Sequence, residues 1–227
     1  DIVIVGGGMV GVSLALLLAR QNHQWKILLL EAHAFQKSPS PSFDARSTAL
    51  SWSSRKIFEA AGLWTALETR ASEIKKIHVS DRGHMGLTRI DAAEAGVEAL
   101  GYVVENHWIG EVLLEKLAAV DVDILAPAKV ASIKALKKGM GLTLEEDDQS
   151  IEASLVVVAD GANSKTAQKI GIHSDHQPYG QQGIIANIEL EKPHDGVAYE
   201  RFTDAGPMAM LPLTDHQGYS RCALVWT

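Results

Sequence analysis

The sequence is poor in the features that hold small secreted domains or fibres together. It has one cysteine, Cys222, so no disulfide can form within the chain, a usage typical of the reducing cytoplasm. It has only 7 prolines and no repeated or low-complexity tract, which argues against a fibrous or disordered protein. Apolar residues make up 46% of the chain, so we expect a globular protein with a substantial core and with Cys222 buried in a strand.

Positive charge is also scarce. The 21 lysines and arginines are outnumbered by 28 acidic residues, and the net charge is −7. Proteins that bind DNA or RNA need clustered basic residues that neutralise phosphates. The charge balance therefore argues against a nucleic-acid partner.

The first part of the chain lacks charge altogether from Ile2 to Ala19. A run of this length is near the lower limit for a membrane-spanning helix. However, four glycines interrupt the run, and β-branched residues dominate its first positions. The run instead predicts a buried parallel strand over residues 1–5, then a tight turn and a helix.

The turn carries a nucleotide-binding motif. Gly6, Gly8 and Gly11 follow the expected strand with the spacing G-x-G-x-x-G. Gly6 permits the tight turn, Gly8 lets the backbone approach a pyrophosphate, and Gly11 lets the helix pack closely on the strand. Residues 12–20 have helical length, and the N-terminus of this helix then faces the phosphates.

A second apolar strand, expected at residues 25–30, is followed by Glu31, twenty residues after Gly11. An acidic side chain at this place accepts hydrogen bonds from ribose hydroxyls and repels a 2′-phosphate. The combination predicts a site for FAD or NAD rather than for NADP. A glycine turn without a ligand is the alternative.

The remaining pattern mixes helices with many strands. Helical periodicity covers residues 50–67 and 110–119, whereas residues 74–81 and 85–91 flank a turn and predict a hairpin. Further strands follow, and the last of them is apolar on both faces, which predicts a strand inside a buried sheet. These strands are expected at residues 121–125, 130–136, 141–146 and 151–158. Residues 177–226 alternate strand-like stretches with turns and predict a second, mainly antiparallel sheet.

Two further motifs give the chain a family resemblance. They are Asp44-Ala45-Arg46 and the stretch A-D-G-A-N-S from Ala159 to Ser164. Together with the glycine motif and Glu31, their order and spacing resemble the group A flavoprotein aromatic hydroxylases, which share the para-hydroxybenzoate hydroxylase fold. Other stretches are similar to the ubiquinone-biosynthesis branch of that family: residues 77–84, 101–106, 200–203 and 206–212.

The resemblance implies an α/β fold. A Rossmann-like FAD-binding domain of the para-hydroxybenzoate hydroxylase type would be interleaved with a mainly antiparallel β-sheet substrate domain. The FAD-binding domain would comprise residues 1–73 and 100–173, and the substrate domain would comprise the hairpin 74–99 and the sheet 174–227. A later G-D motif of the family has no match after Ser164, so we expect an N-terminal fragment with a truncated substrate sheet.

The resemblance also implies roles for single residues. Arg46 would lie against the flavin side, with a surface salt bridge as the alternative. Asp160 and Gly161 match the D-G motif of the family, which is associated with the flavin pyrophosphate and with the use of NAD(P)H. Ala167 stands where the family has an arginine, which predicts a weakened contact with NAD(P)H. The ADP half of FAD would be held by Gly6, Gly8, Met9, Val10, Gly11 and Glu31.

The implied function is that of a monooxygenase. NAD(P)H as co-substrate would reduce FAD, O₂ would then form a flavin C4a-hydroperoxide, and this species would hydroxylate the ring of a polyprenyl phenol in ubiquinone biosynthesis. Contact with other ubiquinone-biosynthesis proteins and with the surface of the inner membrane, from a cytoplasmic location, is implied as well. No catalytic residue and no metal ligand is assigned. The glycine motif also suits two alternatives, an NAD-dependent dehydrogenase and a non-catalytic prenyl-binding escort.

Overall fold

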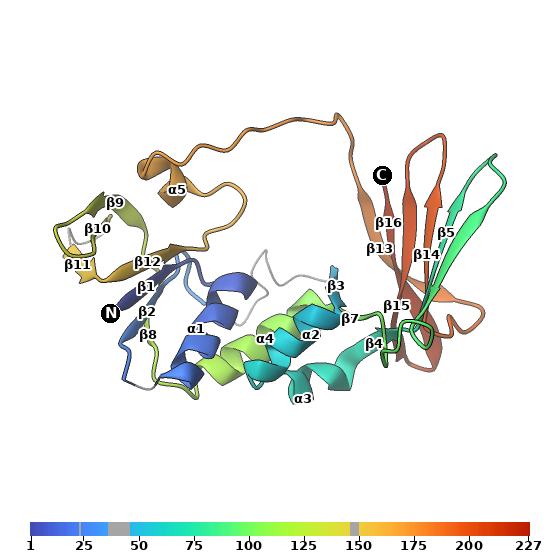
Figure 1. Cartoon of the computed structure of the whole chain (residues 1–227), viewed down its shortest axis with the longest axis horizontal. Coiled ribbons are helices and arrows are strands. Elements are labelled where there is room, and N and C mark those ends of the chain that lie inside the picture. Colours follow the sequence, from blue (N-terminus) through green and yellow to red (C-terminus); the bar gives the residue numbers. More distant parts are fainter. Residues whose placement is uncertain (23, 36–45, 146–149) are drawn as a thin grey trace. The chain divides into compact units, whose positions relative to one another are not determined.

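The chain divides into two compact units, each built from two separate stretches of sequence (Figure 1). The computed structural model describes residues 1–22, 24–35, 46–145 and 150–227. The first unit consists of residues 1–42 and 110–176. The second unit consists of residues 43–109 and 177–227.

A four-stranded parallel sheet, in the order β12-β1-β2-β8, forms the centre of the first unit. Its inner strands are apolar runs, and Ile4 and Leu29 in them are fully buried. Helix α1 packs on β1 and β2, and its buried residues follow the helical spacing i, i+3, i+4, i+7. These residues are Val12, Ala15, Leu16 and Ala19. The bounds are Ile2–Val5 for β1, Met9–Gln21 for α1, Ile27–Leu30 for β2, Asp123–Leu125 for β8 and Leu155–Val158 for β12.

A small antiparallel sheet, β11-β10-β9, shares a core with the parallel sheet. Val3 and Val5 of the parallel sheet belong to one apolar cluster with Val130 and Leu142 of the small sheet. The bounds are Val130–Ala135 for β9, Met140–Leu144 for β10 and Ser150–Ala153 for β11. Helix α5 (Lys165–Lys169) also belongs to the first unit. Helix α4 (Asn106–Leu117) begins in the second unit and continues into residues of the first unit.

The prediction of one buried strand at residues 151–158 is wrong in two respects. The structure splits it into β11 and β12, which belong to different sheets, because the N–H groups of Ser154 and Leu155 both donate to the carbonyl of Asp1 (2.9 and 3.2 Å). Strand β12 also lies at the edge of the described parallel sheet, where Leu155 is 52% exposed instead of buried. The sequence hides the break because both halves are apolar and strand-like.

The second unit contains two sheets, β3-β7-β4 and the six-stranded β13-β16-β15-β14-β5-β6. In the larger sheet, neighbours are antiparallel except β14 and β5, which run parallel. The hairpin predicted from residues 74–91 is confirmed, with Ser80 opposite Leu87. The bounds are Ser47–Ser51 for β3, Ala71–Ile74 for β4, Lys76–Asp81 for β5, Leu87–Asp91 for β6, Gly101–Glu105 for β7, Ile184–Leu190 for β13, Val197–Phe202 for β14, Met208–His216 for β15 and Tyr219–Trp226 for β16.

The helix predicted at residues 50–67 is interrupted. Strand β3 extends to Ser51, whose side chain then accepts a hydrogen bond from Ser54 N and so caps α2. A turn with Gly62 at φ +72° separates α2 from α3, because glycine adopts this left-handed conformation without a steric cost. The bounds are Trp52–Ala60 for α2, Trp64–Leu67 for α3 and Glu68–Arg70 for the 3₁₀ helix η1.

The two sheets of the second unit share an apolar core. It contains Ile74 and Val103 from the small sheet and Ala198, Leu213 and Ala223 from the large one. Cys222 precedes Ala223 on β16 and is only 2% exposed, so its prediction as a buried strand residue is confirmed. Burial raises the pKa of the Cys222 thiol, because the thiolate would lose its hydration.

We predict that Cys222 is unreactive in the folded chain. A raised pKa reduces the fraction of thiolate at a given pH, and burial blocks access of the reagent. At pH 8, the thiol should react with a disulfide reagent at least roughly tenfold more slowly in the native chain than in urea, where local structure is lost. Glutathione serves as the control for reagent activity, and equal rates in both states would contradict the buried position.

Candidate functional site

The candidate site lies at the carboxyl edge of the parallel sheet. Gly6, Glu31 and Asp160 lie just beyond the ends of β1, β2 and β12. Gly6 N donates to the carbonyl of Leu30 (2.8 Å), and Glu31 N donates to that of Leu125 (3.0 Å), so backbone hydrogen bonds continue beyond the strand ends. In open α/β sheets, this edge is where nucleotides bind.

The glycine turn is packed so closely that side chains would not fit. Gly6 has φ +111°, and a Cβ atom there would lie 2.3 Å from the carbonyl oxygen of Ala159. A Cβ atom at Gly11 would lie 1.9 Å from the carbonyl oxygen of Gly6. Both obstacles are backbone atoms, which cannot move aside as a flexible side chain can. Glycine at these positions therefore allows α1 to begin at Met9, after the short turn Gly6-Gly7-Gly8 that follows β1.

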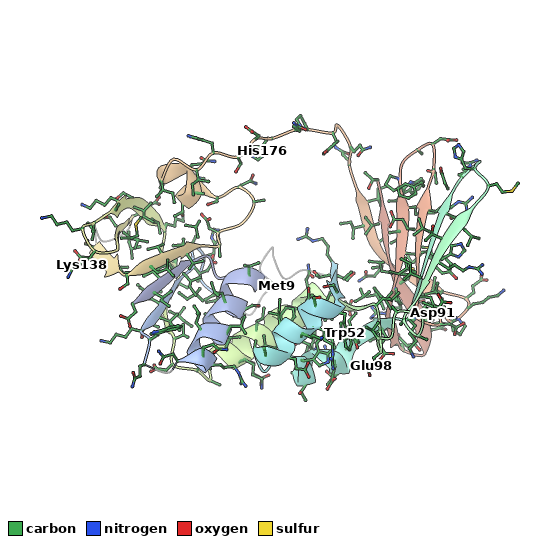
Figure 2. All side chains as sticks on the ribbon, viewed as in Figure 1. Met9, Trp52, Asp91, Glu98, Lys138 and His176 are labelled. Carbon is green, nitrogen blue, oxygen red and sulfur yellow. The ribbon has the colours of Figure 1, made fainter. Side chains whose placement is uncertain are left out.

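The N-terminus of α1 presents backbone N–H groups. Gly8 is the N-cap residue and makes no side-chain cap, and the first hydrogen bond of the helix runs from Val12 N to Gly8 O (3.0 Å). The N–H groups before Val12 have no acceptor within the helix. Met9 begins the helix (Figure 2), and Val10 is 71% exposed. With no acidic residue in the first turn, this end suits a phosphate group.

Glu31 is fixed beside the glycine turn. Its Oε2 atom accepts a hydrogen bond from Gly7 N (2.6 Å), and its Oε1 atom accepts one from His33 N (3.0 Å). A carboxylate oxygen accepts more than one hydrogen bond, so both atoms keep capacity for ribose hydroxyls. The structure thus brings Glu31 together with the glycine motif. Gly7 was missed by the sequence reasoning, although it is the middle glycine of G-G-G and a Cβ there would lie 3.0 Å from Glu31 Oε2.

Asp160 and its neighbours form a capped turn. Asp160 Oδ2 accepts a hydrogen bond from Thr166 N (3.2 Å), and Ser164 Oγ accepts one from Ala167 N (2.9 Å). Gly161 has φ +91°. The second carboxylate oxygen of Asp160, Oδ1, is buried and has no hydrogen-bond partner within the described part of the chain. Because a buried acceptor without a donor is costly, this atom suits a hydroxyl or N–H donor of a ligand.

Arg46 belongs to the second unit, where it directly precedes β3. Its backbone carbonyl accepts a hydrogen bond from Asn106 N (2.8 Å), and the residue as a whole is exposed. Its expected position against a flavin stays a prediction. The neighbouring motif residues Asp44 and Ala45 lie outside the described residues.

Described residues of the second unit line cavities at two places. One, of about 690 Å³, is lined by polar groups that include Glu98 and Tyr102. Burial raises the pKa of the Tyr102 phenol, and the Glu98 carboxylate raises it further. The other, of about 750 Å³, lies on the six-stranded sheet and is lined by His78, Tyr199 and Met210 among others.

The histidines of the resemblance motifs have local partners in this unit. The ring of His78 is 5.6 Å from that of Tyr199, and His84 Nδ1 lies 2.8 Å from Asp81 Oδ2 near the tip of the hairpin. The His84 side chain is 78% exposed.

A partly buried ion pair in the second unit was also missed by the sequence reasoning. Arg221 on β16 lies 3.3 Å from Glu105 at the end of β7, and their side chains are only 16% and 17% exposed. The available signal was a charged residue at the end of the apolar run G-Y-V-V-E. Its partner is 116 residues away and could not be chosen from the sequence.

The residues of the first unit fit the ADP half of FAD. The helix N-terminus offers N–H donors to the pyrophosphate, Glu31 offers acceptors to the ribose, and Asp160 Oδ1 is a buried acceptor in need of a donor. Residues 1–226 match the family model described as FAD binding domain. The chain belongs to this family. The match agrees with the nucleotide expected from the glycine motif and Glu31.

Similar proteins include several named for ubiquinone. Ubiquinone hydroxylase UbiL of Rhodospirillum rubrum is 33% identical over 228 residues, which are 100% of this chain and 51% of the relative. Ubiquinone biosynthesis monooxygenase COQ6 of Caenorhabditis elegans is 34% identical, over 95% of this chain and 50% of the relative. The 3-demethoxyubiquinol 3-hydroxylase of Escherichia coli is 32% identical, over 100% of this chain and 56% of the relative. The chain thus spans about half the length of these relatives.

Solved structures confirm the expected fold. PqsL of Pseudomonas aeruginosa, in complex with 2-aminobenzoylacetate, has a TM-score of 0.77 at 21% identity. The match covers 99% of this chain and 59% of the PqsL chain. The p-nitrophenol 4-monooxygenase PnpA of Pseudomonas putida DLL-E4 has a TM-score of 0.77 at 22% identity. That match covers 98% of this chain and 56% of the PnpA chain. At this identity the likeness shows the fold alone, a Rossmann-like FAD-binding domain interleaved with an antiparallel sheet.

We predict that Gly11→Ala destabilises the chain. Its methyl group would collide with the carbonyl oxygen of Gly6, which should reduce the free energy of unfolding by about 1–3 kcal/mol, as overpacking does. Urea denaturation measures the change. Gly183→Ala is the matched control, because nothing lies within 4 Å of a Cβ atom there. Equal midpoints for both variants would contradict the close contact at the turn.

We also predict that Glu31→Ala weakens FAD binding. The variant removes the acceptors expected for the ribose and releases Gly7 N, so the dissociation constant should rise roughly tenfold or more. Fluorescence titration measures it. Glu111→Ala, at an exposed position on α4, is the control. An unchanged affinity in Glu31→Ala would remove Glu31 from the site.

Proposed function

We propose that this chain carries the dinucleotide site and part of the substrate domain of a FAD-dependent monooxygenase that hydroxylates the aromatic ring of a polyprenyl phenol in ubiquinone biosynthesis. NAD(P)H and O₂ are the proposed co-substrates. The observation that carries the proposal is the Glu31 carboxylate bonded to Gly7 N beside the glycine turn. The similarity to ubiquinone hydroxylases over the whole chain supports the reaction class.

The residues of the first unit bind and orient the cofactor. The N–H groups at Met9 and Val10 are proposed to hold the pyrophosphate, because the α1 N-terminus carries partial positive charge. Glu31 accepts from the ribose hydroxyls and repels a 2′-phosphate, which selects FAD over NADP. Asp160 is proposed to accept a hydrogen bond at its buried Oδ1 atom, with Gly161 in the turn beside it.

Bound FAD supplies the activation of O₂, which protein side chains alone do not provide. The second unit is proposed to contribute Arg46 to the flavin side and its six-stranded sheet to one wall of the substrate cavity. The expected division is retained as part of this proposal, with residues 1–73 and 100–173 serving FAD and residues 74–99 and 174–227 serving the substrate. Ala167 is proposed to leave the contact with NAD(P)H weaker than an arginine would.

The substrate class follows from the ubiquinone branch. Within that branch, the motifs of this chain resemble those of 2-octaprenyl-6-methoxyphenol hydroxylase. A polyprenyl phenol partitions into membranes, so we propose peripheral contact with the inner membrane from the cytoplasm, alongside other ubiquinone-biosynthesis proteins. Among the helices that the structure describes, none has the length and apolar character needed to cross a bilayer.

Strand order weakens the case for an NAD-dependent dehydrogenase. A dehydrogenase of the doubly wound type would place its strands in an unbroken βαβ series. Here the antiparallel strands β9, β10 and β11 intervene between β8 and β12 of the parallel sheet. A prenyl-binding escort on the same fold is distinguished by function, because it would bind prenylated ligand without flavin and without oxidation of NAD(P)H.

We predict that FAD binds saturably and that NAD does not. The chain and a form extended to the length of its relatives would each be titrated with FAD, and flavin fluorescence would report binding. NAD under the same conditions is the control. FAD binding by the extended form, followed by NAD(P)H-dependent hydroxylation of a short-chain prenyl phenol, supports the proposal. NAD binding alone would favour a dehydrogenase, and binding of the phenol without flavin would favour an escort.

A further inference from the structure

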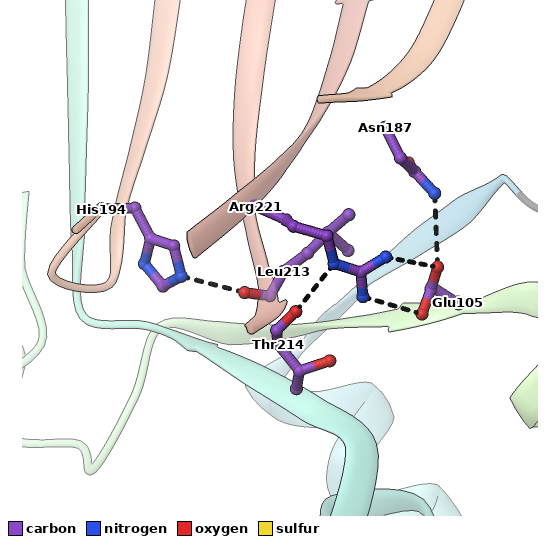
Figure 3. Close-up of polar contacts among 6 residues, drawn as sticks. All are labelled: Glu105, Asn187, His194, Leu213, Thr214 and Arg221. Carbon is purple, nitrogen blue, oxygen red and sulfur yellow. Dashed lines mark hydrogen bonds and ion pairs between the residues drawn. The ribbon is translucent and has the colours of Figure 1, made fainter. Parts of the chain in front are cut away.

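A polar cluster joins the two sheets of the second unit (Figure 3). The Nη2 atom of Arg221 lies 3.3 Å from Glu105 Oε2, and its Nη1 atom lies 3.5 Å from Glu105 Oε1. Asn187 on β13 donates to the same Oε1 atom at 3.3 Å. Arg221 Nε donates to the carbonyl of Thr214 on β15 at 3.0 Å. Glu105 at the end of β7 is thus linked to residues of β13, β15 and β16.

This cluster differs from a surface ion pair. The side chains of Arg221 and Glu105 are only 16% and 17% exposed, whereas those of Lys76 and Asp91 in the same unit are 60% and 30% exposed. Removing two charges from water costs about as much as their attraction returns, so a buried pair adds little net stability. What such a pair does fix is the relative position of the two elements that carry it. The elements here are β7 and the six-stranded sheet.

The end of β7 in turn holds the segment that begins with Arg46. Glu105 is paired with Ser47 across the sheet. The next residue, Asn106, donates its N–H to the carbonyl of Arg46 (2.8 Å), and its Oδ1 atom accepts from Thr48 Oγ1 (2.6 Å). Asn106 is only 8% exposed, so these bonds are shielded from water. A shift of Glu105 therefore moves the backbone of Arg46.

We propose that Glu105 and Arg221 are positioning residues that set where Arg46 lies relative to the six-stranded sheet. The inference rests on the proposed function, in which Arg46 contacts the flavin side and the sheet forms a wall of the substrate cavity. Neither Glu105 nor Arg221 touches a reacting atom in this role. Their effect is transmitted through Asn106, and small displacements of a cofactor contact are costly to binding and reaction alike.

A matched control distinguishes the proposed positioning role of Glu105 and Arg221 from a role in stability alone. His194 also anchors β15, because its Nε2 atom hydrogen-bonds the carbonyl of Leu213 (2.9 Å) next to Thr214 (Figure 3). Its Nδ1 atom accepts from Gly196 N (3.0 Å), so Nε2 is the donor. His194→Asn should destabilise the same sheet without disturbing the Asn106 bond to Arg46. Arg221→Lys keeps the charge and should restore part of what Arg221→Met loses.

The decisive measurement is a double-mutant cycle on FAD affinity. In the form extended to the length of its relatives, Arg221→Met should weaken FAD binding roughly tenfold, and Glu105→Gln should act in the same direction. In an Arg46→Met background, Arg221→Met should have little further effect, because residues that act through one another are not additive. His194→Asn should leave the affinity unchanged.

A second measurement needs no cofactor. Hydrogen exchange of the Asn106 amide in this chain should be faster in Arg221→Met than in the wild type, and unchanged in His194→Asn. Additive effects of Arg46→Met and Arg221→Met, or an unchanged Asn106 amide in Arg221→Met, would overturn the inference while the proposed function stands. If the wild type binds no FAD at both lengths, the proposed function is overturned and the inference with it.

Discussion

The close approach of two backbones at the glycine turn is the constraint on which the first unit depends. The carbonyl oxygen of Gly6 lies 1.9 Å from where a Cβ atom of Gly11 would be, so a glycine there lets α1 follow β1 after a short turn. This geometry leaves the N–H groups of the first helical turn directed out of the helix end. It also brings Gly7 N within 2.6 Å of Glu31 Oε2. The phosphate side and the ribose side of the candidate site thus arise from one steric contact.

The polar residues of the site support the fold as well as the expected ligand. Glu31 accepts hydrogen bonds from Gly7 N and His33 N, and Asp160 accepts one from Thr166 N. Each carboxylate is therefore oriented by backbone donors, which lowers the entropy that a ligand would have to remove on binding. Asp160 Oδ1 at this edge combines burial with unused accepting capacity among the described residues. Preorganisation and an unsatisfied acceptor together explain why this edge suits a dinucleotide.

Local features of the site could be predicted from the sequence, whereas long-range features could not. The spacing of Gly6, Gly8 and Gly11 and the placement of Glu31 follow from steric and electrostatic rules that act over one strand-turn-helix unit. The break at Ser154 depends on a hydrogen bond to Asp1, which no local pattern shows. Likewise, the pairing of Glu105 with Arg221 depends on which strands become neighbours. Family resemblance supplied a role for Arg46, but a single sequence gives no means to derive its position.

The interleaved topology gives the partly buried ion pair of the second unit a role in strand placement. Strands β5 and β14 are parallel neighbours although more than a hundred residues separate them, so their register is not fixed by a short turn. On β16, Arg221 and Ala223 face the small sheet, and a slip by one residue would turn both to the other face. Arg221 would then lose Glu105 and be left as a poorly hydrated charge without its partner, a penalty of about 3–5 kcal/mol for a fully buried pair and smaller here because both side chains retain some exposure. The charge pair therefore favours the arrangement in which β16 presents Arg221 to Glu105 at the end of β7.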